Sequence, residues 1–410
     1  MGLFSRLMGR ETKAASSIED LLREKLLLAG TKSGVPVTWQ TALECSIVLA
    51  CATVKANGLA QVPFKVFKAD GAIRLPATDH KLYDLLSIAP NDFQTSFEFR
   101  QEIGLHLTLT GNAYVWTPRA NGRITELLPL DPGAVTVSRN GWEPTYTVTL
   151  KDASQVTVAA ADMWHLKWLP WAGVEGMDGV KLAREAIGLA VATETHGGLL
   201  FRNGAQPKGM LSTEQMLKED QRKLLRDSWQ EAHSGENKFG TAVMFGGMKY
   251  SLVGYPNDQA QFLETRRHQV EEVCRAFGVM PIMVGHSDKA STYASAEQMF
   301  LHHAVHCLGP LYSCVESSAT RWLLSEKDRR AGYYCRFNAN GLMRGSSQDR
   351  AAYYSKALGA GGSPAWMTQD EIRELEEMNP MGGNAALLRE PSNVGSKVDS
   401  VTEGADDGQA

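Results

Sequence analysis

The stretch DQAQFLETRRHQVEEVCRAFGV, residues 258–279, predicts the first of two long helices around which the chain is organised. Its apolar residues recur at helical spacing and form one stripe, while charged residues cover most of the remaining surface. Pro281 cannot continue a helix, so this helix is expected to end near Val279. A second helix is predicted over Ala296–Leu324, and Ser295 and Gln298 have the spacing of a capping box at its start.

The second helix contains Gly309-Pro310, which predicts a kink in its middle. At about 1.5 Å per residue the two helices are roughly 30 and 40 Å long, which suits a spanning element better than a compact enzyme core. The polar segment between them, Gly285–Ala294 (GHSDKASTYA), predicts a loop presented for contact. An ordinary surface connection is the alternative.

The length and composition of the chain limit the classes of protein to which it can belong. A chain of 410 residues exceeds one core, so about two to four subdomains are expected. The net charge of −4 argues against a protein that grips nucleic acid over a broad basic face, but not against one that surrounds DNA. The six cysteines form no CxxC pair and are expected to be buried, reduced thiols. No apolar run approaches about 18 residues, so neither a membrane span nor a membrane partner is expected.

Residues 38–171 predict an α+β fold with a mostly antiparallel sheet. Helices are expected at Thr38–Leu59, Asp79–Ser87 and Thr95–Leu109, and a strand at Gln61–Lys68. Short β-runs separated by turn signals follow, at Ala113–Pro118, Ile124–Leu130, Val135–Ser138, Tyr146–Leu150, Gln155–Val158 and Asp162–Trp168. Residues 1–37 are polar and mixed in charge and predict a mobile N-terminal arm.

A third long helix is predicted over Gly179–Phe201, apolar nearly all round in its first half and therefore buried against other helices or other copies. The insert between it and Asp258 predicts an amphipathic helix, Gln215–His233, and a hairpin of Thr241–Phe245 with Met248–Val253. The last part of the chain predicts a loop or strand at Gly332–Asn338, a helix at Ser347–Leu358 and a capping box at Thr368–Glu371. Residues 381–410 are polar and acidic and are expected to be disordered.

The sequence contains few residues arranged as in known catalytic motifs. His302, His303 and His306 give HHxxxH, and His302 and His306 share a helical face at the spacing used by zinc enzymes. No glutamate follows as in HExxH and no third ligand is apparent, which favours packing or interface histidines. P-loop, GxSxG and Cys–His motifs are also missing, so no catalytic residue, metal or cofactor is expected. A metal-dependent hydrolase built on His302 and His306 stays open as an alternative.

The order of motifs resembles one family, the portal proteins of long-tailed bacteriophages. The matching stretches extend over nearly the whole chain: Thr41–Phe67, Leu82–Asn91, Gly111–Val115, Glu126–Pro132, Phe201–Leu211, Phe277–Gly285, Ser295–Gln298 and Asp370–Arg373. The resemblance implies a non-enzymatic ring, typically of twelve copies, at one capsid vertex. Another ring-forming connector lower in the tail is a further alternative.

The resemblance also implies a division into subdomains. These are an N-terminal arm (1–37), a wing of helices and antiparallel sheet (38–178), a two-helix stem (179–202 and 258–280), an α/β clip insert (203–257), a tunnel loop (281–294), a long helix spanning the wing (295–327), a helical crown (328–380) and a disordered tail (381–410). A ring also agrees with the predicted long helices, because helices that are apolar on several sides can be buried against neighbouring copies.

The resemblance assigns roles to three groups of residues. The residues expected to line the DNA channel are His286, Ser287, Asp288, Lys289, Ser291 and Thr292. Those expected on the clip surface, for the large terminase subunit and later the head–tail adaptor, are Lys218, Arg222, Arg226 and Lys238. Those expected between copies in the stem are Leu189, Val191, Phe262, Val270 and Phe277.

The remaining partners implied are the major capsid protein and double-stranded DNA passing through the channel. The implied location is the portal vertex of the virion, after assembly in the host cytoplasm. His286 and Lys289 are expected to approach the duplex.

Overall fold

The structure is a computed structural model that describes residues 31–71, 73–140, 143–171, 173–202, 209–213, 218–232, 248–252, 259–286, 293–338, 347–361, 364–376 and 378–389. The chain forms two compact units, Met1–Asn338 and Ala339–Ala410. The first unit holds the wing, stem and clip segments of the sequence analysis. The division falls later than residue 328, where the crown was expected to begin.

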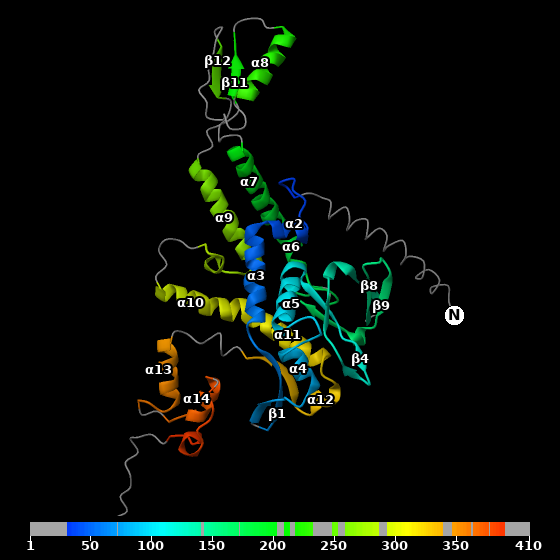
Figure 1. Cartoon of the computed structure of the whole chain (residues 1–410), viewed down its shortest axis with the longest axis vertical. Coiled ribbons are helices and arrows are strands. Elements are labelled where there is room, and N and C mark those ends of the chain that lie inside the picture. Colours follow the sequence, from blue (N-terminus) through cyan, green and yellow to red (C-terminus); the bar gives the residue numbers. More distant parts are fainter. Residues whose placement is uncertain are drawn as a thin grey trace, which may run out of the picture. The chain divides into compact units, whose positions relative to one another are not determined.

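The core of the first unit is built around helix α3 (Ser46–Ala60), which packs against α5 (Ser96–Thr110) (Figure 1). The two helices approach closely at Gly104, where an added Cβ would lie 2.8 Å from the Ala56 Cα. The predicted helix Thr38–Leu59 is divided at Cys45, since α2 (Trp39–Glu44) precedes α3 as a separate helix. Arg100 closes the end of α3, because its Nε and Nη2 donate to the Ala60 carbonyl at 3.1 and 2.7 Å.

The sheets are antiparallel, as the sequence predicts. Among the described residues, three sheets of three strands have the orders β13–β1–β2, β10–β3–β6 and β7–β8–β9. Their strands are β1 (Phe64–Asp70), β2 (Ile73–Pro76), β3 (Asn112–Trp116), β6 (Leu128–Leu130), β7 (Val135–Asn140), β8 (Glu143–Thr149), β9 (Gln155–Val158), β10 (Met163–Lys167) and β13 (Tyr333–Phe337). A small ladder of β4 (Arg119–Ala120) and β5 (Arg123–Ile124) and the helix α4 (Lys81–Ser87) complete this region.

Strand β13 explains the late division between the units. It pairs with β1 in the register Phe64↔Phe337, and these two rings stack with centroids 4.3 Å apart. Residues 333–337 therefore belong to the same sheet as residues 64–76, far away in the sequence. Cross-strand pairing of this kind cannot be read from the local pattern of either strand.

Two long helices, α7 (Arg184–Arg202) and α9 (Gln259–Phe277), pack side by side (Figure 1). The predicted helix Gly179–Phe201 is interrupted at Ala183, which ends the short helix α6 (Gly179–Leu182). Part of the expected N-terminal arm is fixed here. Thr31 is buried and lies close to Gly188, and the Lys32 amide donates to the Glu185 carboxylate at 3.1 Å.

The insert between these helices contains α8 (Glu219–Ala232) and a two-stranded ladder of β11 (Gly209–Ser212) and β12 (Lys249–Leu252). Gly209 pairs with Leu252 and Ser212 with Lys249. The first strand of the predicted hairpin, Thr241–Phe245, lies outside the described residues, and β12 pairs with a strand that the sequence analysis did not expect. The amphipathic helix was predicted correctly but starts later than Gln215.

The second predicted long helix is a run of three segments, α10 (Tyr293–His303), a π-helical turn η5 (Ala304–Leu308) and α11 (Gly309–Trp322). A kink was predicted at Gly309-Pro310, and the structure has a π-helical turn directly before Gly309, because Pro310 has no amide to donate to the preceding turn. The Gly309 amide instead closes the π-turn on the Ala304 carbonyl. The capping box at Ser295 is wrong, since the helix already begins at Tyr293. A further helix, α12 (Glu326–Arg330), leads to β13.

The second unit contains α13 (Ser347–Ala357), α14 (Gln369–Leu375) and a 3-10 turn η7 (Gly383–Ala386). The capping box at Thr368 and Glu371 is confirmed, since both of its reciprocal hydrogen bonds are present. The tail expected to be disordered from residue 381 has an ordered start. Amides of Met381 and Gly382 donate to the Asp370 carboxylate at 2.7 and 2.9 Å.

Candidate functional site

The residues before the predicted loop form an ordered turn. In it, α9 ends at Phe277 with a Schellman motif. Gly278 has a positive φ of 66°, its amide donates to the Arg275 carbonyl, and the Val279 amide donates to the Cys274 carbonyl. The helix thus ends before Pro281, which starts the short helix η4 (Pro281–Val284) instead. The chain leaves this turn at His286, whose amide donates to the Pro281 carbonyl at 3.0 Å.

Of the six predicted channel residues, the structure describes His286. Its Nε2 lies 3.7 Å from the Glu271 Oε1 on α9, so a protonated His286 forms an ion pair there. The other five, Ser287, Asp288, Lys289, Ser291 and Thr292, lie outside the described residues. The chain is described again from Tyr293, where α10 begins.

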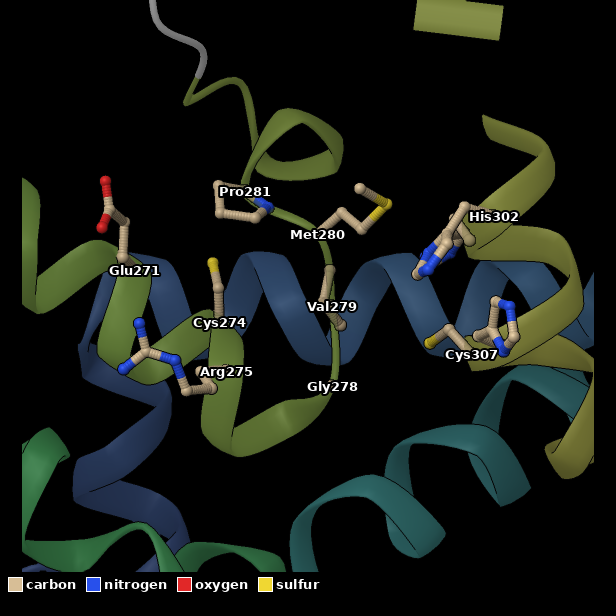
Figure 2. A pocket seen from close by; sticks show the side chains of 11 residues that line it. Glu271, Cys274, Arg275, Gly278, Val279, Met280, Pro281, His302 and Cys307 are labelled. Atoms are coloured by element: carbon tan, nitrogen blue, oxygen red, sulfur yellow. The ribbon is translucent and has the colours of Figure 1, made fainter. Parts of the chain in front are cut away.

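A cavity of about 380 Å³ opens between the two sides of this loop. Figure 2 shows α9 and η4 contributing one wall, with Glu271, Cys274 and Pro281, and the α10–η5 run contributing the other, with His302 and Cys307. The full lining is Glu271, Cys274, Arg275, Gly278, Val279, Met280, Pro281, His302, His303, His306 and Cys307. The cavity therefore lies between the C-terminal end of α9, which precedes the loop, and the C-terminal end of α10, which follows it.

The three histidines of HHxxxH line this cavity in different environments. The rings of His302 and His306 are exposed and lie 4.4 Å apart between centroids. His303 is buried, and its Nδ1 has no hydrogen-bond partner. Burial, the nearby Lys55 charge and His302 lower the pKa of His303. Among the described residues, no group of three donors is placed to hold a metal ion.

The cysteines around the cavity are packing groups. Cys51 on α3 and Cys274 on α9 are fully buried with their sulfur atoms 3.8 Å apart, and both are free thiols. The hydrogen bond with Cys274 and then burial raise the pKa of Cys51, and burial raises that of Cys307, while the hydrogen bond with Cys51 lowers the pKa of Cys274. Cys51 and Cys307 therefore stay protonated at neutral pH and are poor nucleophiles. Buried, reduced cysteines were expected from the sequence.

Of the predicted clip residues, Lys218 is exposed directly before α8, Arg222 and Arg226 are exposed on α8, and Lys238 lies outside the described residues. Acidic side chains alternate with them on the same helix, at Glu219, Asp220 and Asp227. The helix therefore presents mixed charge and not a uniformly basic face.

The predicted stem residues divide into two groups. Leu189 is 44% exposed, and Val191 and Val270 are half-buried, so all three remain accessible. Phe277 is only 6% exposed and lies against Gly179 of α6, which places it in the chain's own core and not on a surface between copies. Phe262 lies on α9, and its side chain is outside the described residues.

Sequence reasoning missed Lys55, which lies in the middle of the buried helix α3. Its ammonium group is buried beside the carbonyl of Phe277, the last residue of α9, at 3.4 Å. The available signal was a single lysine inside an otherwise apolar helical run.

None of the described helices is long and apolar enough to cross a lipid bilayer.

The fold is shared with proteins of known structure. An HK97 family phage portal protein from Corynebacterium diphtheriae matches with a TM-score of 0.57 at 17% identity, over 75% of this chain and 97% of that chain. The neck of an empty gene transfer agent (GTA) particle, computed with C6 symmetry, matches with a TM-score of 0.58 at 21% identity, over 84% of this chain and 95% of that chain. The structure thus has a portal-protein fold.

Sequence comparison gives the family. The portal protein of Enterobacteria phage HK97 is 31% identical over 357 residues, which cover 86% of this chain and 83% of the relative. Residues 46–377 match the family described as Phage portal protein, and the chain belongs to that family. It is therefore a structural protein of a phage capsid, a portal for DNA packaging. The comparisons support this function over a metal-dependent hydrolase or another tail connector.

Proposed function

We propose that twelve copies of this chain form a ring at one capsid vertex and that double-stranded DNA passes through its centre during packaging and ejection. The main evidence for a ring is that large apolar side chains on α6 and α7 are exposed to solvent in the single chain. Leu182, Leu189 and Leu199 are 63%, 44% and 44% exposed. Large apolar side chains along a long helix favour burial against another copy, and a head-to-tail contact that closes gives a ring. The C6 symmetry of the structurally similar GTA neck is compatible with a twelve-membered ring.

The division of labour follows the elements. Residues 38–178 form the wing, α6–α7 and α9 form the stem, residues 203–257 form the clip, and residues 281–294 form the tunnel loop. The run α10–η5–α11 spans the wing. We place the crown after Asn338, because β13 belongs to the sheet of β1.

The tunnel loop contacts the duplex weakly. DNA has to slide in both directions, and each added phosphate contact would increase salt-dependent affinity and slow that movement. The loop offers one lysine, Lys289, beside Asp288 and the hydroxyls of Ser287, Ser291 and Thr292. His286, held near Glu271, and Lys289 are the residues that approach the duplex.

The clip contacts the large terminase subunit during packaging and the head–tail adaptor afterwards. The exposed positions of Lys218, directly before α8, and of Arg222 and Arg226 on α8 support this assignment. Mixed charge on the same helix suits a contact that has to be exchanged, because charged rim contacts contribute to association rate and specificity more than to affinity. The wing contacts the major capsid protein, and assembly takes place in the host cytoplasm.

Imaging the purified full-length protein by negative-stain electron microscopy tests the ring, with native mass spectrometry to count its copies. We expect closed rings with a central hole wide enough for duplex DNA. Protein that stays a folded monomer, both in concentrated solution and in particles, would contradict the proposal.

Deleting residues 287–291 tests the loop separately. Rings are expected to form as before, while packaged DNA is reduced or lost from particles. Loss of rings on this deletion would refute the proposed division between stem and loop.

A further inference from the structure

We infer that Lys55 is a positioning residue that holds α9, the helix before the tunnel loop, in place against η5, the turn that ends the helix after the loop. The inference rests on the proposed role of the tunnel loop and adds a residue that positions its flanking segments. It starts from one face of α3, where Cys51, Lys55 and Gly58 follow each other at helical spacing.

The two residues that flank Lys55 on this face each contact one side of the loop. Cys51 lies against Cys274 of α9, with the sulfur atoms 3.8 Å apart. Gly58 lies under Leu308 of η5, where an added Cβ would be 2.5 Å from the Leu308 Cδ2. The Gly58 carbonyl also accepts a hydrogen bond from the Tyr312 hydroxyl at 2.7 Å. Lys55 therefore lies between the α9 side and the η5 side of the loop.

The Lys55 ammonium group closes the end of α9. The Schellman motif there uses the carbonyls of Cys274 and Arg275, so the carbonyl of Phe277 needs another donor. Lys55 Nζ supplies it at 3.4 Å, and the same nitrogen lies 5.3 Å from the centre of the Trp168 ring. A positive charge at a helix C-terminus is also favoured by the helix dipole.

Among the described residues, no carboxylate acts on the Lys55 charge. Within the described part of the chain, the titratable groups that act on it are the thiols of Cys51 and Cys307, and it acts in turn on His303. Burial lowers the pKa of Lys55. A buried ammonium group without a carboxylate is costly, and an apolar side chain of similar length would pack there at lower cost. What the lysine adds is a directional link between the Phe277 carbonyl at the end of α9 and α3, the helix whose Gly58 packs against Leu308 of η5.

Hydrogen exchange of assembled rings, followed by mass spectrometry, tests this assignment with Lys55→Met. We expect exchange in peptides covering residues 278–286 and 303–308 to become roughly tenfold faster, while peptides of α11 stay unchanged, because a local opening is made easier without global unfolding. Lys55→Arg keeps a charged donor and is expected to restore most of the protection. Lys68→Met is the matched control, because Lys68 also lies over an aromatic ring, 5.5 Å from the centre of Tyr333, but is exposed.

Two outcomes would overturn the assignment. One is unchanged exchange at residues 278–286 and 303–308 in Lys55→Met. The other is an equal acceleration in α11, which would show that Lys55 serves general stability. If Lys55→Met fails to form rings, the same comparison of peptides is made on unassembled wild-type and variant chains.

The exchange measurement uses no DNA, so its result is independent of the proposed role of the loop. Should deletion of residues 287–291 leave packaging intact, the proposed role of the loop fails while the Lys55 result stands. Should the deletion reduce DNA retention and Lys55→Met leave exchange unchanged, the Lys55 assignment alone fails.

Discussion

The two ends of the helical run Tyr293–Trp322 are held in very different ways. On α11, Leu311, Tyr312, Val315 and Ala319 are buried in the chain's own core. On α10, Phe300 and Leu301 are more than half exposed, although they are as apolar as the residues of α11. α11 is thus supported by its own chain, whereas the described side chains of α10 before His303 are mostly exposed.

Hydrogen bonds follow the same division. Ser318 accepts the indole N–H of Trp164 at 2.9 Å, Glu316 accepts the Phe337 amide at 2.8 Å, and Thr320 accepts the Cys335 amide at 3.0 Å. These bonds tie α11 to β10 and β13. The π-turn η5 separates this fixed half from α10, and π-turns are often found at functional sites. The difference teaches that one run of helical segments can be buried in the core at one end and exposed at the other.

The largest effect is expected from shortening a side chain in the supported half. Leu311→Ala removes a side chain that is 1% exposed and leaves a cavity, so the free energy of unfolding should fall by about 2–5 kcal/mol. Urea unfolding of dissociated chains measures it. A loss below about 1 kcal/mol would mean that α11 is not part of a packed core.

Acid should weaken the supported region through His165, which accepts from the Tyr146 hydroxyl at 3.2 Å and donates to the Asn112 side-chain oxygen at 3.0 Å. Burial, followed by the Lys167 charge, lowers the pKa of His165 to about 3 from 6.5. The unfolded chain then binds the proton more readily. The contribution is complete above pH 6.5 and is lost as the pH falls towards 3, by up to about 1.4 kcal/mol per pH unit.

The variant His165→Gln isolates this effect. Unfolding free energies at pH 7, 6, 5 and 4 are measured for both proteins, and the variant should show the shallower fall. Equal slopes would mean that other groups cause the acid sensitivity.

Ser318→Ala should cost about 1–3 kcal/mol, because it leaves the buried indole N–H of Trp164 without an acceptor. The thermal unfolding midpoint, compared with that of Ser317→Ala, measures this. Ser317 is the neighbouring serine, and its hydroxyl donates to the Ser313 carbonyl within the same helix. Equal midpoints for the two variants would contradict the role given to Ser318.

The smallest effect on stability is expected in the unsupported half. Leu301 is 53% exposed, so Leu301→Ser should change the unfolding free energy of the single chain by less than about 0.5 kcal/mol. If neighbouring copies cover α10, the same change should reduce the yield of rings. Normal ring yield together with normal stability would mean that neighbouring copies do not cover Leu301 of α10.

The sequence predicted well the elements whose pattern is local. The antiparallel α+β class, the amphipathic helix α8, strand β9 (Gln155–Val158) and the capping box at Thr368 each follow from residues within one element. The family also followed from the order of short motifs along the chain. Errors fell where neighbouring residues compete: the end of α9 is set by Gly278 and not by Pro281, and α10 begins at Tyr293 and not at Ala296.

The candidate site was predicted only in part. The loop and its flanking helices follow from the sequence, but the cavity between them and the role of Lys55 do not. The sequence shows a lysine in an apolar helix but not its hydrogen-bond partner, because the carbonyl of Phe277 is distant in the chain. Burial of Phe277 was likewise invisible, because an apolar residue on a helical stripe has the same pattern whether it faces its own core or another copy.

Periodicity, helix caps and the order of motifs depend on residues that are close together in the sequence. The sequence by itself therefore determined the kinds of element, their order and the portal family. Pairing of β13 with β1, the junction of α3 with both sides of the loop, and the unequal support of α10 and α11 were decided only by the tertiary structure. The physical reason is that burial depends on contacts between segments far apart in the chain, and no local pattern specifies which segments will meet.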